Sequence, residues 1–512
     1  MHEIELKFQV PAARRHALGA ALAPAVRVRL AAVYFDTADR RLAEAGLGLR
    51  LRREGRRWVQ TCKGAATDGI DRAEHNVLRG AGAAMPTVEP RLHAEAPLGA
   101  ALRAALGGAD ASTLVASYRT EIERRTRERL VRAPRGRVEL ALDTGRIAAG
   151  DRHIDVCEFE IELRAGPPMA VIDTARRWVP RFGLWLDSRS KAERGDLLAR
   201  GETTAAPRPA LPVALRREMS EAQAWQAVLR SCADQIIGNA SQVASGEHAA
   251  EHVHQLRIGL RRLRSALRLF DEAAAGPALG APATLLFKAL GDARDQSVVE
   301  HEFGARLRSA MQAVGIEGSV PWPAAAGAAV SAADHVRAAA SQMFLLDVLA
   351  AMQGTSDAGA AAPVAAPPVP ALRDSLAKRL NRWHRQVVSG AKRFVELDEA
   401  GRHRLRKRAK RLRYAAEFSA SLFEKRRVRR YLKALRALQD RLGAYTDAVM
   451  AAQQFAPPAG GTEGTAPATP PTADPQAMFA LGWLVAQREH LVAAAVPGLQ
   501  AFARAERFWK RD

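Results

Sequence analysis

The sequence Glu3-Ile-Glu-Leu-Lys7, close to the N-terminus, alternates charged and apolar side chains. In a β-strand successive side chains point to opposite faces, so the three charged residues share one face and the two apolar residues share the other. The same alternation recurs at Glu158-Phe-Glu-Ile-Glu162 and, with positive charge, at Arg50-Leu-Arg52. These stretches predict a sheet in which one face is charged and the reverse face is apolar.

The charged faces have a chemical implication. Carboxylates two positions apart on a strand lie about 7 Å apart and repel each other. If the acidic strands share a cavity, hard divalent cations such as Mg²⁺ or Mn²⁺ would relieve this repulsion, because they prefer oxygen ligands. The basic faces would then hold the oxygen atoms of an anionic substrate, a combination that indicates phosphoryl chemistry. The alternative is an ordinary antiparallel sheet with one solvated face.

Composition supports an anionic partner. The chain has 512 residues, of which 77 are Lys or Arg and 55 are Asp or Glu, and its formal net charge is +22. This excess predicts binding to phosphate, nucleic acid or an acidic surface. The length is sufficient for several domains, each with its own core.

Cysteine content and hydropathy bear on the compartment. The cysteines are Cys62, Cys157 and Cys232, and no pair has Cys-x-x-Cys spacing. This excludes a disulfide framework and argues against a structural zinc site. The N-terminus lacks the pattern of a signal peptide, and no apolar run is long enough to span a membrane. We therefore expect a cytoplasmic protein without a membrane partner.

The chain divides into a strand-rich and a helical part. Short alternating runs, with turn signals such as Asp143-Thr-Gly145, fill the first part, and Leu and Ala at helical spacing fill the second. Three prolines mark the linker between them. Two Pro-, Gly- and Ala-rich segments are expected to be flexible loops. The predicted boundaries are 1–200 for the strand-rich domain, 201–215 for the linker, 216–508 for the helical domain, 216–353 and 372–508 for its two repeats, and 354–371 and 456–474 for the loops.

The helical part contains a duplicated motif, since residues 254–264 match residues 403–413 at six of eleven positions. On a helix each copy places a row of basic residues beside a row of apolar ones. A solvated basic face is the alternative interpretation, but duplication favours a polyanion along the row. Aromatic residues are sparse on these helices, which disfavours single-stranded nucleic acid. The basic rows are His254, Arg257, Arg261, Arg264 and Arg268 in the first copy, and His403, Arg406, Lys410 and Arg413 in the second.

Residues 1–200 resemble the CYTH, or triphosphate tunnel metalloenzyme, family. The resemblance rests on a set of motifs in family order. These are Glu3-x-Glu5-x-Lys7, Tyr34-Phe-Asp-Thr37, Gly46-Leu-Gly-Leu-Arg-Leu-Arg52, Gln60-Thr-Cys-Lys-Gly64, Arg72-x-Glu74, Tyr118-Arg119-x-Glu121, Glu139-Leu-Ala-Leu-Asp143, Glu158-x-Glu160-x-Glu162 and Ser190-Lys-Ala-Glu-Arg-Gly195. The resemblance implies an antiparallel β-barrel with flanking helices, whose interior is a charged tunnel.

The resemblance also implies roles for individual residues. Glu3, Glu5, Glu160 and Glu162 would bind metal, and Glu3, Glu5 and Lys7 would be central to catalysis. Asp143 and Glu158 remain open, since Asp143 could instead serve a turn before Gly145. The implied mechanism is in-line attack of metal-activated water on a terminal phosphoryl group. The residues implied to bind phosphate are Lys7, Arg50, Arg52, Lys63, Arg119 and Lys191.

Residues 216–508 resemble the CHAD domain, an all-α module of two duplicated helical bundles, and this implies binding of inorganic polyphosphate. The expected fold is therefore α+β with two domains. The combination resembles bacterial inorganic triphosphatases, which implies Mg²⁺-dependent hydrolysis of tripolyphosphate to diphosphate and phosphate. Three alternatives stay open: a nucleoside or thiamine triphosphatase or adenylate cyclase of the same fold, a non-catalytic polyphosphate-binding or granule-associated protein, and a nucleic-acid binder. The oligomeric state is not predicted.

Overall fold

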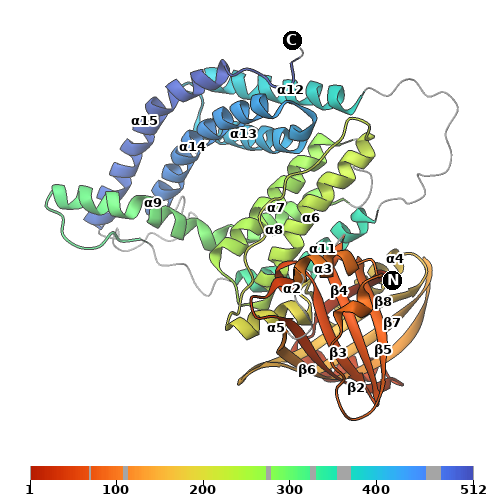
Figure 1. Cartoon of the computed structure of the whole chain (residues 1–512). Helices are drawn as coiled ribbons and strands as arrows, with labels where there is room; N and C mark the ends of the chain where they lie inside the picture. The colour runs from red at the N-terminus through yellow and green to blue at the C-terminus, as the bar shows by residue number, and fades with distance from the viewer. Residues whose placement is uncertain are drawn as a thin grey trace.

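The computed structural model describes residues 2–67, 71–107, 113–271, 278–322, 330–353, 371–456 and 474–510. An antiparallel β-barrel occupies the N-terminal part, and a larger set of helices follows (Figure 1). The predicted α+β fold, with a barrel followed by an all-helical part, is confirmed. None of the helices in the described part of the chain is long and apolar enough to cross a membrane.

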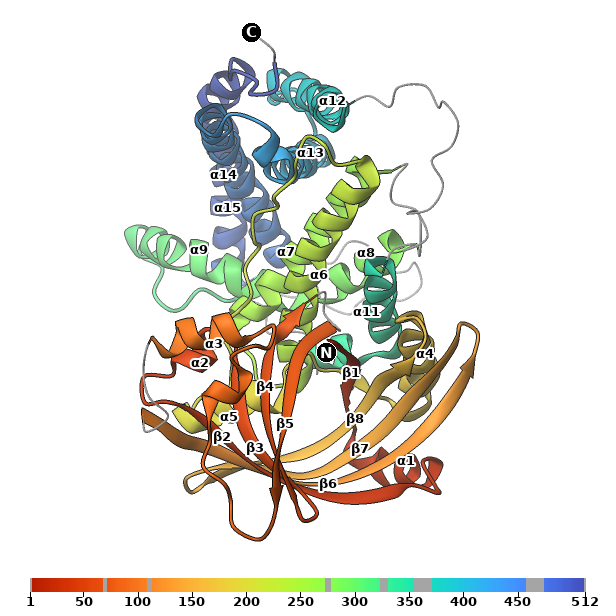
Figure 2. The ribbon, with the colours of Figure 1, turned by 45° about the vertical axis from the view of Figure 1, so that its right-hand side comes forward.

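Eight strands close the barrel within the described residues. Their order is β5-β4-β3-β2-β6-β7-β8-β1, and β1 returns to pair with β5, so the sheet has no free edge there. A short ninth strand pairs with β1. Figure 2 shows strands β1 to β8 curving around the barrel. The strands are β1 (His2–Gln9), β2 (Val26–Thr37), β3 (Gly48–Glu54), β4 (Arg57–Thr67), β5 (Asp71–Ala81), β6 (Leu114–Arg132), β7 (Arg135–Ala149), β8 (Arg152–Ala165) and β9 (Trp185–Leu186).

Apolar side chains cover the outside of the barrel where helices pack against it. Phe8 of β1 and Phe159 of β8 belong to a buried cluster with Ala175 of α4, while Leu49 and Cys62 pack with residues of α2 and α3. Because the strands alternate, their charged faces must turn inward. The helices of this half are α1 (Arg15–Ala21), α2 (Arg41–Glu44), α3 (Gly99–Leu106), α4 (Met169–Phe182) and α5 (Lys191–Arg200), with 3₁₀ turns at Ala12–Arg14 and Pro90–His93.

The predicted turn at Asp143-Thr-Gly145 is wrong, because these residues lie inside the continuous strand β7. Gly145 serves a different purpose. A Cβ atom there would lie 1.9 Å from the carbonyl oxygen of Glu121 on the neighbouring strand, so only glycine permits the two backbones to approach. Asp143, in the same strand, lines the barrel cavity.

The helical half begins after residues 202–220, which the structure describes throughout and which form neither helix nor strand. The two motif copies lie on α7 and α13. The segments expected as loops, 354–371 and 456–474, fall outside the described residues except for Ala371, Ala456 and Asp474. The helices are α6 (Glu221–Ser245), α7 (Ala250–Leu269), α8 (Gly280–Ala289), α9 (Asp292–Ala313), α10 (Ala332–Arg337), α11 (Ala339–Met352), α12 (Leu372–Lys392), α13 (Glu399–Ser419), α14 (Lys425–Phe455) and α15 (Pro475–Ala503), with a 3₁₀ turn at Ala420–Leu422.

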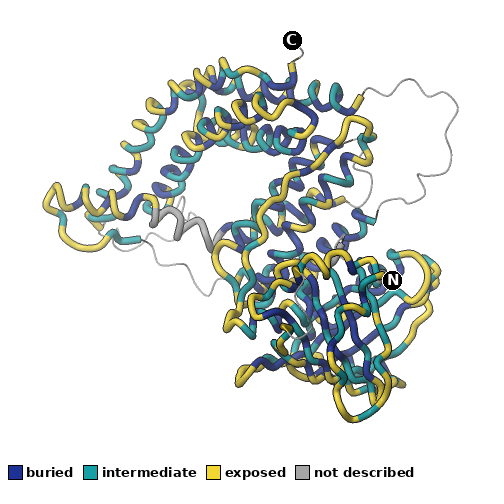
Figure 3. Tube along the Cα trace, viewed as in Figure 1, coloured by how far each residue is buried: buried dark blue, intermediate teal, exposed yellow. Residues whose placement is uncertain are grey.

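The two halves share one apolar core. The buried cluster that contains Phe8 and Phe159 of the barrel continues without a break through Ile237 of α6 and Leu345 of α11. Both α6 and α7 are buried along much of their length (Figure 3). This continuity fixes the helical half against the barrel.

Gly145→Ala tests the close approach of β6 and β7. The added methyl group overlaps the Glu121 carbonyl, so we expect a loss of about 3 kcal/mol or more in the free energy of unfolding. The control is Gly150→Ala, where a Cβ atom meets nothing within 4 Å and only the positive φ of 59° opposes alanine. That variant should lose about 1 kcal/mol. Equal losses in urea denaturation would contradict the assignment.

Candidate active site in the barrel and basic face of the helical half

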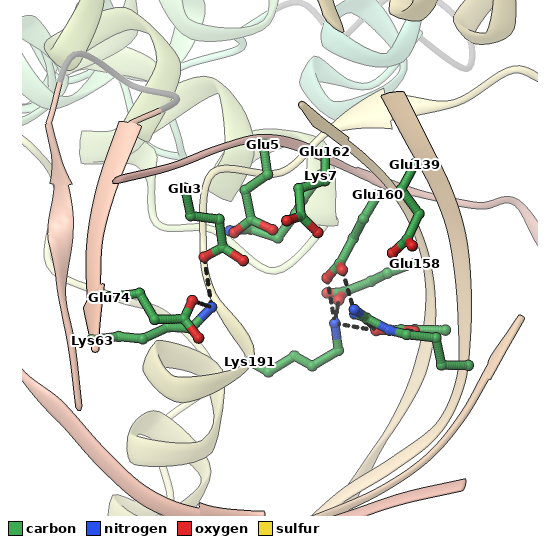
Figure 4. A network of polar contacts seen from close by, with 12 residues as sticks. Glu3, Glu5, Lys7, Lys63, Glu74, Glu139, Glu158, Glu160, Glu162 and Lys191 are labelled. Carbon is green, nitrogen blue, oxygen red and sulfur yellow. Dashed lines mark hydrogen bonds and ion pairs between the residues drawn. The ribbon is translucent and has the colours of Figure 1, made fainter. Parts of the chain in front are cut away.

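The barrel interior contains a cavity of about 630 Å³. Its walls carry both signs of charge, and the charged side chains project inward from several strands and from α5 (Figure 4). The strand register brings them together, since Lys7 of β1 lies opposite Glu160 of β8. Most of the residues predicted for the site line this cavity, namely Glu3, Glu5, Lys7, Arg50, Arg52, Lys63, Glu160 and Lys191.

The wall formed by β1, β4 and β5 pairs two lysines with three glutamates. Lys63 Nζ lies 2.6 Å from Glu3 Oε2 and 2.6 Å from Glu74 Oε2, and Lys7 Nζ donates to Glu5 Oε1 at 3.0 Å. Burial, followed by repulsion from Glu5, raises the pKa of Glu3 to about 7. The two lysines therefore do not neutralise the three glutamates of this wall.

The neighbouring wall, next to β1, is an acidic cluster on β7 and β8. Asp143, Glu158 and Glu160 each place a carboxylate oxygen within 4.8 Å of the others. Lys191 Nζ lies 2.8 Å from both Asp143 Oδ2 and Glu160 Oε1 and also contacts Glu158. Although burial opposes the charge on Lys191, these three acids outweigh it and raise its pKa. Lys191 is therefore a firmly charged ammonium group inside the cavity.

The start of α5 aims Lys191 into the cavity. Ser190 is the N-cap of this helix, and its side chain and that of Glu193 form a reciprocal capping box. This fixes the first turn of α5, of which Lys191 is the first residue. The local sequence therefore determines the position of Lys191 at the start of α5. Strands β7 and β8 of the barrel supply the acids that it contacts.

Two arginines on β3 line the cavity. Arg50 Nη1 donates to the hydroxyl group of Tyr34 at 3.0 Å, and Arg52 forms an ion pair with Glu54. The Nε atoms of both arginines are buried and have no hydrogen-bond partner within the described residues. A buried donor without a partner is costly, so these positions favour an anionic ligand that accepts both bonds.

Arg119 is the predicted phosphate-binding residue that the structure places elsewhere. Its side chain is 59 % exposed, pairs with Glu121 at 3.9 Å and does not line the cavity. The physical reason is strand alternation, because Tyr118 and Thr120 on either side of it face inward. We therefore correct its assignment to an outward position.

Arg124 is the functional candidate that the sequence analysis missed. It lines the cavity, donates to Asp143 through Nε at 2.7 Å and through Nη2 at 2.6 Å, and also contacts Glu160. It lies six residues after Tyr118 and so shares its face, which the structure shows to be the inward one. Alternation in the sequence did not single it out, because β6 carries arginines at both odd and even positions.

Glu162 is one of the four acids predicted to bind metal. Glu162 is the cross-strand neighbour of Glu5 and bonds Arg164, although it does not line the described cavity. Burial, with repulsion from Glu139 and Glu5 against the opposing effect of Arg164, raises its pKa to about 7. Figure 4 shows the carboxylates of Glu3, Glu5, Glu160 and Glu162 turned toward one region of the interior. An all-oxygen donor set in which Glu3 and Glu162 have a raised pKa fits a hard divalent cation.

In the helical half, the two basic rows face each other across α7 and α13. The pKa of Lys410 on α13 is lowered to about 6, first by burial and next by Arg261 of α7. Arg406 and Arg413 add to this effect, and Asp447 of α14 opposes it. The two copies of the motif therefore form one basic face with more positive charge than the acid beside it offsets.

An aromatic ring organises the first row. The guanidinium carbons of Arg257, Arg261 and Arg264 lie 5.0, 5.6 and 5.6 Å from the ring centroid of Phe287 on α8. Arg257 also donates to the carbonyl of Leu290 at 3.1 Å. These contacts hold three cations in a fixed array.

Comparisons with known families agree with this geometry. Residues 1–195 match the CYTH domain family, and residues 227–456 match the CHAD domain family. The chain therefore carries a CYTH domain followed by a CHAD domain.

Individual proteins are similar to parts of this chain. The chain is 30% identical over 170 residues to the inorganic triphosphatase of Haemophilus influenzae, an alignment that spans 32% of this chain and 44% of that protein. The CHAD domain from the plant Ricinus communis is 29% identical, with 60% of this chain and 99% of that chain covered and a TM-score of 0.45. A protein from Hippeastrum, described as an adenylyl cyclase with a dominant triphosphatase activity, is 20% identical, with 40% and 97% covered and a TM-score of 0.29.

Lys410→Met tests the crowding of positive charge on the basic face. An unfolded lysine has a pKa of about 10.4, whereas that of Lys410 in the folded chain is about 6. The unfolded chain therefore binds an extra proton between these values, and stability rises with pH across that window.

Removing the titration should raise Tm, and the gain should be larger near pH 6 than near pH 9. Lys407→Met, at an exposed position on the same helix, is the control and should show no such difference. The same gain at both pH values would contradict the interpretation. The measurement is thermal unfolding without added anions.

Proposed function

We propose that the barrel hydrolyses inorganic triphosphate to diphosphate and phosphate with the help of a divalent cation, Mg²⁺ or alternatively Mn²⁺. The observation that carries this proposal is the cavity, whose lining gathers cations from several strands and from α5. The buried Nε donors of Arg50 and Arg52 lie on one side and Lys191 on another. A polyphosphate chain has oxygens on all sides and can accept from both.

The proposed roles follow from position. Lys7, Arg50, Arg52, Lys63 and Lys191 would bind phosphate oxygens, and Arg124 joins this set in place of Arg119. They would stabilise negative charge on the leaving diphosphate as the bond to the terminal phosphorus breaks. Glu3, Glu5, Glu160 and Glu162 would hold the metal, and Asp143 and Glu158 place carboxylate oxygens within 4.8 Å of that of Glu160. When bound, the metal would screen the phosphates and lower the pKa of the attacking water.

The inorganic substrate is favoured over nucleotides by the character of the cavity wall. Of the aromatic residues in the lining, Tyr34 and Tyr118 stack on each other with ring centroids 4.6 Å apart, and Phe35 packs against the apolar cluster around Leu49. The activity named for the Haemophilus influenzae relative supports the same choice. A nucleoside or thiamine triphosphatase and an adenylate cyclase remain the alternatives, and a panel of substrates would distinguish them.

The helical half would bind inorganic polyphosphate along the basic face formed by the two rows. The support is the lowered pKa of Lys410, since a polyanion would supply the missing negative charge. Free thiols at Cys62, Cys157 and Cys232 fit a reducing compartment, so we place the protein in the cytoplasm, where polyphosphate granules would be one location.

Glu5→Gln tests the proposed hydrolysis. The change removes one negative charge from the metal-binding wall at nearly constant volume, so phosphate release from tripolyphosphate with Mg²⁺ should fall about hundredfold or more. The control is Glu121→Gln, an outward position that is 48 % exposed and pairs with Arg146. Equal activity of wild type and Glu5→Gln would remove the proposed metal site.

Arg261→Ala combined with Arg406→Ala tests polyphosphate binding, because it takes one cation from each motif copy. The Kd for long-chain polyphosphate should rise about tenfold or more. The control is Arg426→Ala with Arg429→Ala, which removes the same charge from exposed positions at the start of α14. Equal weakening in both pairs would indicate binding by net charge alone and would refute a specific face.

A further inference from the structure

The cavity of the barrel is not closed by the barrel alone. Its lining continues onto the linker and the helical half, where Arg208, Arg230, Asp234, Ile237 and Gly238 belong to the same cavity as Glu5 and Lys191. The four positions on α6 are spaced by four, three and one residues, so they lie on one face of this helix. We call these five residues the outer wall.

Arg208 is held firmly in this wall. Its main chain is fixed by Asn239, whose Oδ1 accepts from Arg208 N at 3.1 Å and whose Nδ2 donates to Arg208 O at 2.9 Å. Its side chain crosses α6 at Gly238, where a Cβ atom would lie 2.2 Å from Arg208 Cδ. Its guanidinium group lies 3.2 Å from Asp234 and 3.6 Å from Glu193 of α5, which orients it between the two halves.

The outer wall is also fixed relative to the catalytic residues. The chain from β9 to Lys191 is hydrogen-bonded to the helical half at two points. Leu186 N donates to Gln342 Oε1 of α11 at 2.7 Å, and Ser188 N donates to Ser241 Oγ of α6 at 2.9 Å. Both acceptor residues are about 1 % exposed. These buried contacts tie the chain that leads to Lys191 to α6 and α11.

We propose that Arg208 and Arg230 form an outer phosphate-binding position that lets the barrel act on linear polyphosphate longer than triphosphate. This proposal rests on the proposed hydrolysis and extends its substrate class. The terminal phosphoryl group would lie among the barrel cations, and units beyond the third would reach the outer wall.

The chemistry of the wall suits this role. Guanidinium groups bind phosphate oxygens through paired hydrogen bonds and stay charged at any physiological pH. As in the barrel, the carboxylates beside Arg208 orient the cation before the substrate arrives. Water would add to the terminal phosphorus and the bridging P–O bond would break. The shortened chain is the leaving group and keeps the bonding electrons. The terminal phosphoryl group becomes orthophosphate, and a proton of the water passes to solvent.

The test compares tripolyphosphate with linear polyphosphate of about six phosphoryl groups, which extends past the barrel cations to the outer wall. The variant is Arg208→Ala with Arg230→Ala in the full chain. The ratio of kcat/KM for the longer chain to kcat/KM for tripolyphosphate should fall about tenfold, mainly through KM of the longer chain. Arg216→Ala with Arg217→Ala removes the same charge from exposed positions outside the cavity and should leave the ratio unchanged.

The outcomes separate this inference from the proposed function. A wild type that releases no phosphate from tripolyphosphate refutes the proposed hydrolysis and the outer position with it. If the wild type is active on tripolyphosphate and the ratio is unchanged in the double variant, the outer position alone is refuted. A ratio that falls equally in the control pair also refutes it, because the effect would then reflect net charge.

Discussion

The structure depends on placing opposite charges face to face inside a closed barrel. Removing a charge from water is costly unless a partner compensates, so a charged interior is stable only when cations and acids are paired across it. Lys191 shows how this is met, since three carboxylates surround its ammonium group. Arg124 bridges two of the same acids from the adjoining strand β6. Closure of the barrel through β1 and β5 adds a further contact of this kind, because it brings Glu3 of β1 against Lys63 of β4.

The pairing is incomplete in a way that matches a substrate. Glu3 and Glu162 retain a raised pKa, which a divalent cation would reverse. Arg50 and Arg52 retain buried donors, which phosphate oxygens would accept. Since these groups are already held in place, the proposed metal–triphosphate complex would bind with little reorganisation of the protein. The interior thus combines local ion pairs with defined sites for one more cation and one more anion.

The helical half uses the opposite electrostatic principle. There the basic residues of α7 and α13 crowd together, and the pKa of Lys410 falls where that of Lys191 rises. A lysine beside acids is held in its charged form, whereas a buried lysine beside arginines is driven toward neutrality until an anion arrives. The shared apolar core joins these two environments rigidly, which gives the cavity an outer wall made by α6 and the linker.

The sequence by itself determined the charged and apolar faces of the strands, because side-chain alternation is a local property of the chain. It also identified both domain families and most of the cavity residues, from Glu3 to Lys191. Tertiary structure decided what depends on strand register and on contacts between distant segments. Alternation could not choose between Arg119 and Arg124 until the register of β6 was fixed. The sequence around Gly145 predicted a turn, whereas in the structure Gly145 lies in a strand and permits the close approach of the Glu121 backbone. The approach of Arg208 and Arg230 to the cavity could not be predicted, because no local pattern records which helix face a barrel will meet.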